Sequence, residues 1–173
     1  MHIAPYDNRN TAIVGVDDPV VPLTYFNIVK LRRGEVFESL VAGYETCIVP
    51  ATGSVNVSVA GQKFAGIGNR GVDVWDGEPE GVYVPVGLPA RIECLSDHAE
   101  VFVAGAKFDE VLEPFAVQAE ALDVIQYGSD DTKTHRKIKH ISKVCGITCS
   151  RQLRSRARYC FASACIAAGV VWL

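Results

Sequence analysis

Between Tyr25 and Phe108, apolar and polar residues alternate in short runs that end at Gly, Pro or charged turn residues. Runs with this pattern predict β-strands, and almost nothing in the region has a helical period. The expected strands are Tyr25–Leu31, Thr46–Pro50, Ser54–Val59, Val82–Pro85, Ala90–Leu95 and Glu100–Ala104. Several short strands with turn residues between them indicate an all-β fold, an antiparallel sandwich or barrel.

The strictest alternation lies at Val55, Val57 and Val59, with Asn56 and Ser58 between them. Such a strand needs one buried face and one solvated face. An antiparallel sheet supplies both, whereas a parallel sheet is usually covered on both faces. This run is the best local evidence for the fold class.

The pattern changes after Phe108. Asp109–Glu113 predicts a helical turn that Pro114 stops, and Ala116–Gln126 favours neither helix nor strand. From Cys149 to Val171 the chain is rich in Arg, Ala and Ser, which predicts an irregular or partly helical tail. The late apolar run Cys160–Leu173 is about 14 residues, short of the roughly 20 that a membrane helix needs, so no membrane span is expected.

Charge divides the chain near Ser142. Residues 1–131 hold all 20 acidic residues and eight of the 17 Lys and Arg, a formal charge of −12, whereas residues 132–173 hold nine Lys and Arg and no acid. We therefore expect one domain with its linker at 1–141 and an atypical basic tail at 142–173. Since the N-terminal residues lack the pattern of a secretory signal, a cytoplasmic location is expected. In a reducing cytoplasm, Cys47 and Cys94 are expected to be buried apolar residues rather than a disulfide framework.

Several segments together carry a resemblance to a known family. They are Tyr25–Glu35, Gly68–Pro79, Val82–Gly87, Ala99–Ala106 and His135–Ile141. With these segments, residues from about Tyr25 to Ile141 resemble the N-terminal half of 5-deoxy-glucuronate isomerase, a bicupin of inositol catabolism. The resemblance implies a cupin-type β-sandwich or barrel, followed in longer members by a second cupin with a His-rich metal motif.

The resemblance also implies an activity. Members of the family convert 5-deoxy-D-glucuronate into 5-dehydro-2-deoxy-D-gluconate, an aldose–ketose isomerisation that needs a base to move a proton and a divalent metal to stabilise the developing charge. The alternative interpretation is a non-catalytic cupin-like module that binds a sugar acid or assembles with a partner. A small sugar acid is the expected ligand in both cases, and a barrel without its second half would expose apolar surface and tend to form a homo-oligomer.

The cupin ligand positions are apolar in this chain. Aligned from Gly34 to Gly53, the two His positions of the first cupin motif fall on Leu40 and Ala42, and Glu45 lies about one place off the Glu position. In the second motif, aligned on Pro85–Gly87, the His position falls on Ala90. The sequence therefore predicts no metal ligand and no cofactor in this barrel, leaves the catalytic residues unassigned, and predicts little or no isomerase activity for the chain itself.

The tail offers two other chemistries. Its cysteines, Cys145, Cys149, Cys160 and Cys165, fit zinc-knuckle spacing only in part. Its arginines, Arg151, Arg154, Arg156 and Arg158, have few aromatic neighbours and follow an acidic domain, which disfavours nucleic acid as a partner. Translation in a shifted frame after about Ile141 would explain both the missing acids and this composition, and it predicts that another frame of the downstream DNA encodes a metal-binding cupin.

Within the domain, Arg70, Asp73 and Asp76 are the residues most suggestive of a sugar-acid site, because Arg can hold a carboxylate in a bidentate pair. Ion pairing within a loop at the end of a sheet is the competing interpretation, and the commoner use of such residues. The histidines do not predict a catalytic base. His98 is expected in an exposed turn, His2 at a terminus, and His135 and His140 on a basic linker.

Overall fold

The computed structural model describes residues 9–129, 131, 136–139, 141 and 171–172. It consists almost entirely of antiparallel β-structure. The strands are β1 (Thr24–Arg32), β2 (Val36–Ser39), β3 (Tyr44–Val59), β4 (Gln62–Arg70), β5 (Gly81–Val84), β6 (Ala90–Cys94), β7 (His98–Lys107), β8 (Phe115–Val117), β9 (Val124–Tyr127), β10 (Arg136–Lys139) and β11 (Val171–Trp172). The described helical structure is one 3₁₀ turn, η1 (Ala119–Ala121).

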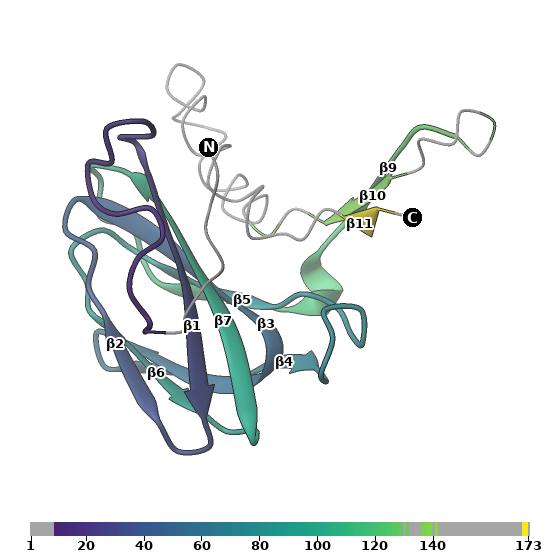
Figure 1. Ribbon diagram of the computed structural model, residues 1–173, viewed down its shortest axis with the longest axis horizontal. Helices are drawn as coiled ribbons and strands as arrows, with labels where there is room; N and C mark the ends of the chain where they lie inside the picture. The colour runs from purple at the N-terminus through teal and green to yellow at the C-terminus, as the bar shows by residue number, and fades with distance from the viewer. Residues whose placement is uncertain (1–8, 130, 132–135, 140, 142–170, 173) are drawn as a thin grey trace.

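The strands form two facing layers of a cupin-type sandwich (Figure 1). We call the first sheet the strands β1, β7, β5, β8 and the first half of β3, which pair in the order β1-β7-β3-β5-β8. The second sheet contains β2, β6, the second half of β3, and β4. Every pairing is antiparallel, as the alternating sequence predicted.

Strand β3 belongs to both sheets. Its residues up to Thr52 pair with β7, and those from Gly53 onward pair with β4 and β6. The register with β7 shifts between Pro50 and Thr52, where the strand turns from one layer into the other. Gly53 at this corner has φ +72°, and a Cβ built there would lie 2.3 Å from the His98 carbonyl oxygen. Only glycine fits this backbone without displacement.

A two-residue turn joins β3 to β4. Val59 pairs with Gln62, and the residues between them, Ala60 and Gly61, have φ of +49° and +84°. Positive φ at both central positions is the pattern of a type I′ hairpin, whose twist matches that of the flanking strands. The turn begins directly after Val59, where the predicted strand Ser54–Val59 ends.

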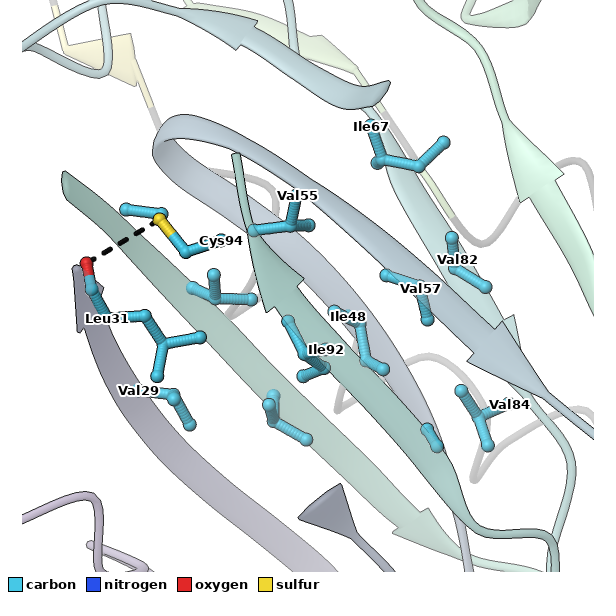
Figure 2. Packing of buried hydrophobic residues seen from close by; sticks show 14 of the residues in the cluster. Val29, Leu31, Ile48, Val55, Val57, Ile67, Val82, Val84, Ile92 and Cys94 are labelled. Atoms are coloured by element: carbon cyan, nitrogen blue, oxygen red, sulfur yellow. Dashed lines mark hydrogen bonds between the residues drawn. The ribbon is translucent and has the colours of Figure 1, made fainter. Parts of the chain in front are cut away.

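Aliphatic side chains fill the space between the two sheets (Figure 2). The alternating residues of β3, Val55, Val57 and Val59, are almost completely buried there, and Ile48, from the half of β3 in the first sheet, is fully buried. Ile92 and Cys94 of β6 enter from the second sheet. Burial of these side chains in one continuous apolar interior stabilises the sandwich through the hydrophobic effect. Within this interior, the Cys94 thiol donates to the Leu31 carbonyl oxygen at 3.7 Å.

A second apolar cluster lies on the outer face of the first sheet. Because side chains alternate along a strand, Val49 points away from Ile48 and out of the sandwich. It packs with Ala104 of β7 and Val117 of β8, and Leu122 and Ile141 complete the cluster. Beyond this layer, β9 pairs with β10, and β10 with β11, in a separate small sheet.

The structure alters several local expectations. The two strands predicted at Thr46–Pro50 and Ser54–Val59 are one continuous strand, and β2 and β4 were not predicted. The helical turn predicted at 109–113 is wrong, since these residues have no regular structure. Too few residues lie there to offset the cost of helix nucleation, and Pro114 disfavours a helical residue before it.

The tail at 142–173 lies outside the described residues except for β11, which is a strand. The boundary expected near Ser142 therefore stays a prediction. None of the helical structure described is long and apolar enough to cross a membrane.

Candidate functional site

The structure places the cupin ligand positions apart from one another. Leu40 is 61% exposed and Ala42 is also exposed, whereas Ala90 is buried in the core between the sheets. Glu45 has the same parity on β3 as Val49, so its side chain lies on the outer face of the first sheet. These four positions therefore do not converge inside the sandwich.

Glu45 has a different use. It is 7% exposed, and its Oε2 accepts a hydrogen bond of 2.7 Å from the Tyr83 hydroxyl. The Tyr83 ring stacks on Phe115, with ring centroids 4.9 Å apart. A hydrogen bond to a buried carboxylate offsets part of its desolvation cost, so the pair anchors β3 to β5.

The interior does not fit the divalent metal that the fold family implies. Metal sites of this kind require several imidazole or carboxylate ligands. The hydrophobic cluster between the sheets consists of aliphatic side chains, the Cys94 thiol and a few aromatic rings, and the buried polar residues Asn27 and Thr46 on the same strands carry neither kind of ligand. Within the described ranges, no three His, Cys, Asp or Glu residues lie close enough together to hold a metal ion. We assign no chemical step through a metal to this half of the fold.

The charged segment between β4 and β5, residues 70–80, is organised by its own carboxylates. Asp73 Oδ1 accepts the Trp75 N–H at 3.0 Å, and Asp76 Oδ2 accepts the Asp73 N–H at 2.9 Å. At the base of the loop, the buried Glu80 accepts the Gly68 N–H at 2.8 Å. Asp73 and Asp76 thus hold the backbone of the loop in shape, a role typical of Asp in turns.

Arg70 lies at the start of this loop and is half-buried. Its Nε–H donates to the Gly77 carbonyl oxygen at 3.1 Å, which draws the side chain across the two ends of the loop. Burial lowers the pKa of Arg70, and the negative charge of Glu78 opposes that shift. Among the described residues, Arg70 forms no ion pair within 4 Å with Asp73, Asp76 or Glu78, so the sequence-predicted grouping of Arg70 with the two aspartates is not an ion-paired cluster.

Glu78 itself forms an ion pair with a lysine. The Lys139 Nζ lies 2.6 Å from Glu78 Oε2, and the Lys139 side chain is only 18% exposed. This contact ties the loop to β10, more than sixty residues further along the chain. We call Arg70, Glu78 and Lys139 the charged triplet. It contains two cations and one carboxylate.

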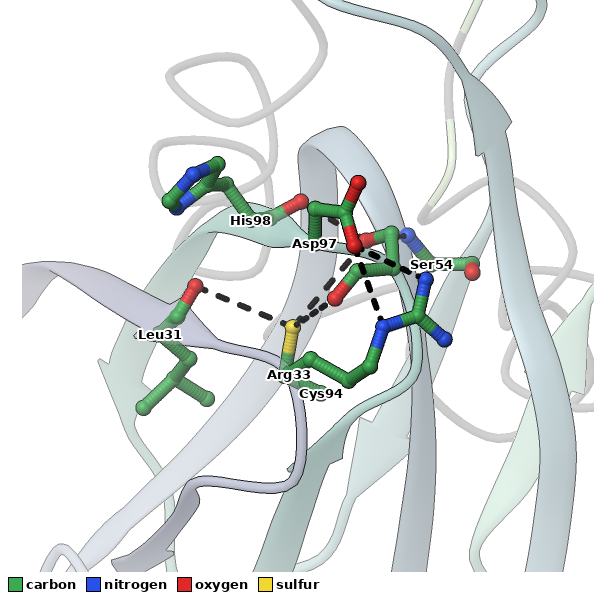
Figure 3. A network of polar contacts seen from close by, with 7 residues as sticks. Leu31, Arg33, Ser54, Cys94, Asp97 and His98 are labelled. Atoms are coloured by element: carbon green, nitrogen blue, oxygen red, sulfur yellow. Dashed lines mark hydrogen bonds and ion pairs between the residues drawn. The ribbon is translucent and has the colours of Figure 1, made fainter.

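A second polar network lies at the corner of β3, beside the start of the loop, where the Gly53 N–H donates to the Gly71 carbonyl oxygen at 3.2 Å (Figure 3). Ser96 Oγ accepts the Ser54 N–H at 3.0 Å and donates to the His98 carbonyl oxygen at 2.7 Å. Arg33 and Asp97 form an exposed ion pair of 3.0 Å above it. Because these contacts bind backbone to backbone around a tight turn, the network is structural.

Cys94 and His98 belong to this structural end. Burial raises the pKa of the Cys94 thiol, against the opposing effect of its contacts with Ser96, so the thiol is a poor nucleophile at neutral pH. Cys94 is buried as predicted, but Cys47 is only half-buried. His98, expected in a turn, is instead the exposed first residue of β7, because the turn is one residue shorter than the sequence indicated.

The remaining sequence candidates lie outside the described residues: His2, His135, His140, the four tail cysteines and the tail arginines. Sequence reasoning also missed the ion pair between Glu78 and Lys139. Both lie in segments that carried the family resemblance, Gly68–Pro79 and His135–Ile141, so those segments held the signal. What joins the two segments is the path of the chain, which local patterns do not reveal.

Comparison with known proteins places these features in a family. The model of the KduI/IolB family matches residues 2–152, most of the chain. The chain belongs to the KduI/IolB family. The match extends beyond both ends of the resemblance first noted, which ran from about Tyr25 to Ile141, and it includes the whole sandwich, the charged triplet and the apolar ligand positions.

Two relatives carry the name 5-deoxy-glucuronate isomerase. The protein from Listeria monocytogenes EGD-e is 25% identical over 139 residues, which cover 78% of this chain and 50% of the relative. The Listeria innocua protein is also 25% identical, with the same coverage. The chain thus spans about half the length of the curated relatives that it matches.

Solved structures support the fold. An IolB-like protein from Salmonella typhimurium LT2 superposes with a TM-score of 0.61 at 22% identity, covering 69% of this chain and 44% of that one. Protein YlbA from E. coli has a TM-score of 0.50 at 14% identity, covering 80% of this chain and 59% of that one. At these identities the likeness concerns the fold alone.

Proposed function

We propose that this chain supplies the first cupin half of a sugar-acid isomerase, one that converts 5-deoxy-D-glucuronate into 5-dehydro-2-deoxy-D-gluconate in myo-inositol catabolism. The observation that carries the proposal is the family match over residues 2–152, together with the name of the Listeria relatives. Those relatives are about twice as long as the matched region. The half of them that lies outside the match is where we place the divalent metal and the acid–base groups.

The structure of this half supports a structural role for it. The interior is filled with valine and isoleucine, and the positions that would carry imidazoles in a metal-binding cupin are Leu40, Ala42 and Ala90. A carboxylate, Glu45, remains near the motif but is held on the outer face by Tyr83. Without a base in the interior, proton transfer between the two carbons of a sugar has no evident agent in this sandwich.

An isomerase assay tests the proposal. The purified 173-residue chain, incubated with 5-deoxy-D-glucuronate and Mn²⁺, Fe²⁺ or Zn²⁺, is expected to give little or no ketose by NMR, and the Listeria monocytogenes relative serves as the active control. Rapid turnover by the chain alone would contradict the placement of the chemistry in the other half.

A second arm tests the family function itself. If the DNA past codon 141 encodes a His-rich cupin in another reading frame, a protein with that frame restored is expected to isomerise the substrate. An inactive restored protein, folded and loaded with metal, would rule out this activity for the gene.

The alternative is a non-catalytic sugar-acid-binding or assembly module, which the apolar residues at the cupin ligand positions, Leu40, Ala42 and Ala90, also fit. Such a module would bind a uronate without converting it, even when joined to a second cupin. Cytoplasmic location, self-association as a homo-oligomer, and the absence of nucleic-acid partners are further parts of the proposal. They rest on the sequence arguments above.

A further inference from the structure

The free edge of β1 is covered by residues 10–14, a segment that precedes it in the chain and that we call the edge strap (Figure 1). β1 is the edge strand of the first sheet, next to β7. Its odd-numbered residues bond to β7, since the Lys107 N–H donates to the Leu23 carbonyl oxygen at the start of the same register. In an antiparallel pair the bonding direction alternates, so the even-numbered residues direct their N–H and C=O groups to the free edge.

Two residues of the strap cap this edge. Val14 pairs with Phe26 through two backbone hydrogen bonds of 3.0 Å. The Asn10 side chain imitates a strand, because its Oδ1 accepts the Lys30 N–H at 2.9 Å and its Nδ2 donates to the Lys30 carbonyl oxygen at 3.1 Å. Ile28 lies between Phe26 and Lys30, and its outward N–H and C=O have no backbone partner among the described residues. The strap therefore covers the edge without satisfying all of it.

The bound strap carries two unfavourable features. Asn10 has φ of +54°, in the left-handed region that residues other than glycine seldom adopt. Its carbonyl oxygen accepts the Asn27 Nδ2–H at 3.1 Å, while Asn27 Oδ1 has no hydrogen-bond partner among the described residues, on a side chain only 1% exposed. A buried acceptor without a donor loses the free energy of its hydration. Release of the strap would relax the backbone of Asn10 and let water reach Asn27.

The strap can open without the loop that follows it. That loop is tied to the sandwich at Asp17, whose Oδ1 lies 2.7 Å from the Lys107 Nζ and whose N–H donates to the Tyr44 hydroxyl at 3.0 Å. Gly15 and Val16 join the strap to this anchor. Val16 is 49% exposed, and nothing lies within 4 Å of the Cβ position of Gly15. A change in the backbone of these two residues is therefore enough to lift the strap from β1.

The uncovered edge would be complementary to itself. If a two-fold axis passes through Ile28, two antiparallel copies of β1 place Ile28 opposite the partner's Ile28 and Phe26 opposite the partner's Lys30. The outward groups of all three residues then find backbone partners, whereas the strap serves only Phe26 and Lys30. Like charges do not lie opposite each other in this register, and Lys beside an aromatic ring is a favourable pair. Pairing of this kind is isologous, as in most homodimers.

We propose that the free edge of β1 binds β1 of a second copy of this chain, and that the edge strap covers this surface until it opens at Gly15. An uncovered edge strand is a template for pairing with another chain, which is why proteins cover such edges. The inference names a surface for the self-association in the proposed function and rests on the proposed function only in that respect.

Removal of the Asn10 side chain tests the role of the strap. Asn10→Ala in the 173-residue chain removes both side-chain hydrogen bonds to Lys30, so the open form becomes more populated. We expect dimerisation at least ~10-fold tighter than in the wild type, measured by analytical ultracentrifugation over a concentration series. By NMR, amide hydrogen exchange at Phe26, Ile28 and Lys30 should be fast in the dilute monomer and slow in the dimer.

Asn56→Ala is the matched control for Asn10→Ala. Asn56 also caps an edge strand, since its Oδ1 accepts the Gly66 N–H of β4 at 3.2 Å. It lies on the second sheet, far along the chain from β1, and its loss should leave the dimerisation constant at the wild-type value. Equal tightening by both variants would show a general effect of lost edge contacts and would overturn the role of the strap.

Charges at Ile28 test the register. Asn10→Ala chains that also carry Ile28→Lys or Ile28→Glu would place like charges opposite each other at the two-fold axis, so each should remain monomeric. An equimolar mixture should restore a dimer with one chain of each kind, which native mass spectrometry detects. Dimerisation of either variant alone, as tight as that of Asn10→Ala, would overturn the pairing of β1 with β1.

The outcomes are independent of the isomerase assay. A folded Asn10→Ala chain that dimerises no more tightly than the wild type would overturn the inference. So would a dimer in which the outward amides of β1 still exchange rapidly, because the surface would then lie elsewhere. Tighter dimerisation with protected β1 amides would support the surface even if the restored full-length protein had no isomerase activity.

Discussion

The outer faces of the two sheets differ in character. On the first sheet, the outward residues of β3 and β7 include Cys47, Val49 and Ala104, which pack in one apolar cluster with Leu122 and Ile141. On the second sheet, the outward residues of β3 are Ser54, Asn56 and Ser58, all partly exposed. Both faces include parts of the same strand, yet one is apolar and covered and the other is polar and open to solvent.

This difference follows from what packs on each face. Within the described residues, β8 extends the first sheet, Leu122 and Ile141 pack on its outer face, and the Glu78–Lys139 ion pair ties the loop at 70–80 to β10. An apolar sheet face is normally covered by another layer, whereas a polar face needs none. We therefore expect changes to the first sheet to affect stability and association, and changes to the second sheet's outer face to be tolerated.

The corner that joins the faces should be the most sensitive point. Gly53→Ala forces a Cβ to within 2.3 Å of the His98 carbonyl oxygen and 2.4 Å of Ser96 Oγ, at φ +72°. We expect a loss of about 4 kcal/mol in the free energy of unfolding, measured by urea denaturation, or failure to fold.

Gly61→Ala is the control for Gly53→Ala. Gly61 also has positive φ, but nothing lies within 4 Å of its Cβ position. It should cost only about 1 kcal/mol, the price of the backbone conformation alone. Equal losses in the two variants would show that the close approach at the corner has no energetic importance.

Substitution on the two outer faces tests the comparison directly. Val49→Ala removes two buried methyl groups from the covered face and should cost about 2–3 kcal/mol, because of lost burial and the cavity left behind. Ser58→Ala on the open face should change stability by no more than about 0.5 kcal/mol. If the two variants are equally stable, the covered face contributes nothing and its apolar character needs another explanation.

The hydrogen-bonded pair Tyr83 and Glu45 is the polar exception on the covered face, and breaking it should have a smaller effect on stability. Tyr83→Phe removes the 2.7 Å hydrogen bond to the buried Glu45 carboxylate while leaving the ring stacked on Phe115. We expect a loss of about 2 kcal/mol by denaturant titration, typical of a hydrogen bond to a charged group. A double variant with Glu45→Gln should lose less than the sum of the two singles, since Glu45→Gln removes the charge of the acceptor and Tyr83→Phe removes the donor of the same hydrogen bond.

Alkaline pH tests the interior rather than either outer face, and we expect it to have the smallest effect on the free energy of unfolding. Burial raises the pKa of the Cys94 thiol, so the unfolded chain releases this proton first as the pH rises. The free energy of unfolding should therefore be constant at neutral pH and decline above about pH 8.5, where an ordinary thiol ionises. Cys94→Ala should reduce the slope of that decline, and an unchanged slope would contradict the assignment to Cys94.

The sequence predicted those parts of the fold in which local pattern and burial agree. Val55, Val57 and Val59 alternate because one face of β3 is buried, and the structure confirms this strand. The sequence did not predict strand β4. It is an edge strand, and its glycines of positive φ, Gly66 and Gly68, interrupt any alternation of apolar and polar residues. Its place in the sheet comes from pairing with β3 rather than from its own sequence.

The candidate site was predictable only in part. Apolar residues at the ligand positions could be read from the sequence, but the outward direction of Glu45 follows from the register of β3, which a one-residue shift would reverse. Arg70 was noted for its chemistry, with Asp73 and Asp76 as neighbours in sequence. Its hydrogen bond is instead with the Gly77 carbonyl oxygen, and the neighbouring Glu78 pairs with Lys139, an arrangement that depends on the long path from β4 to β10.

The shared strand β3 has a consequence for how the protein folds. One end of it closes a local hairpin, where Val59 pairs with Gln62, whereas the first sheet must also bring Thr24 to Ala106. Hairpins form in about 1–10 μs, but pairing of distant segments is slower because the entropy of loop closure is lost first. Since both sheets include β3, neither can be completed without the other, and the sandwich should fold and unfold as one cooperative unit.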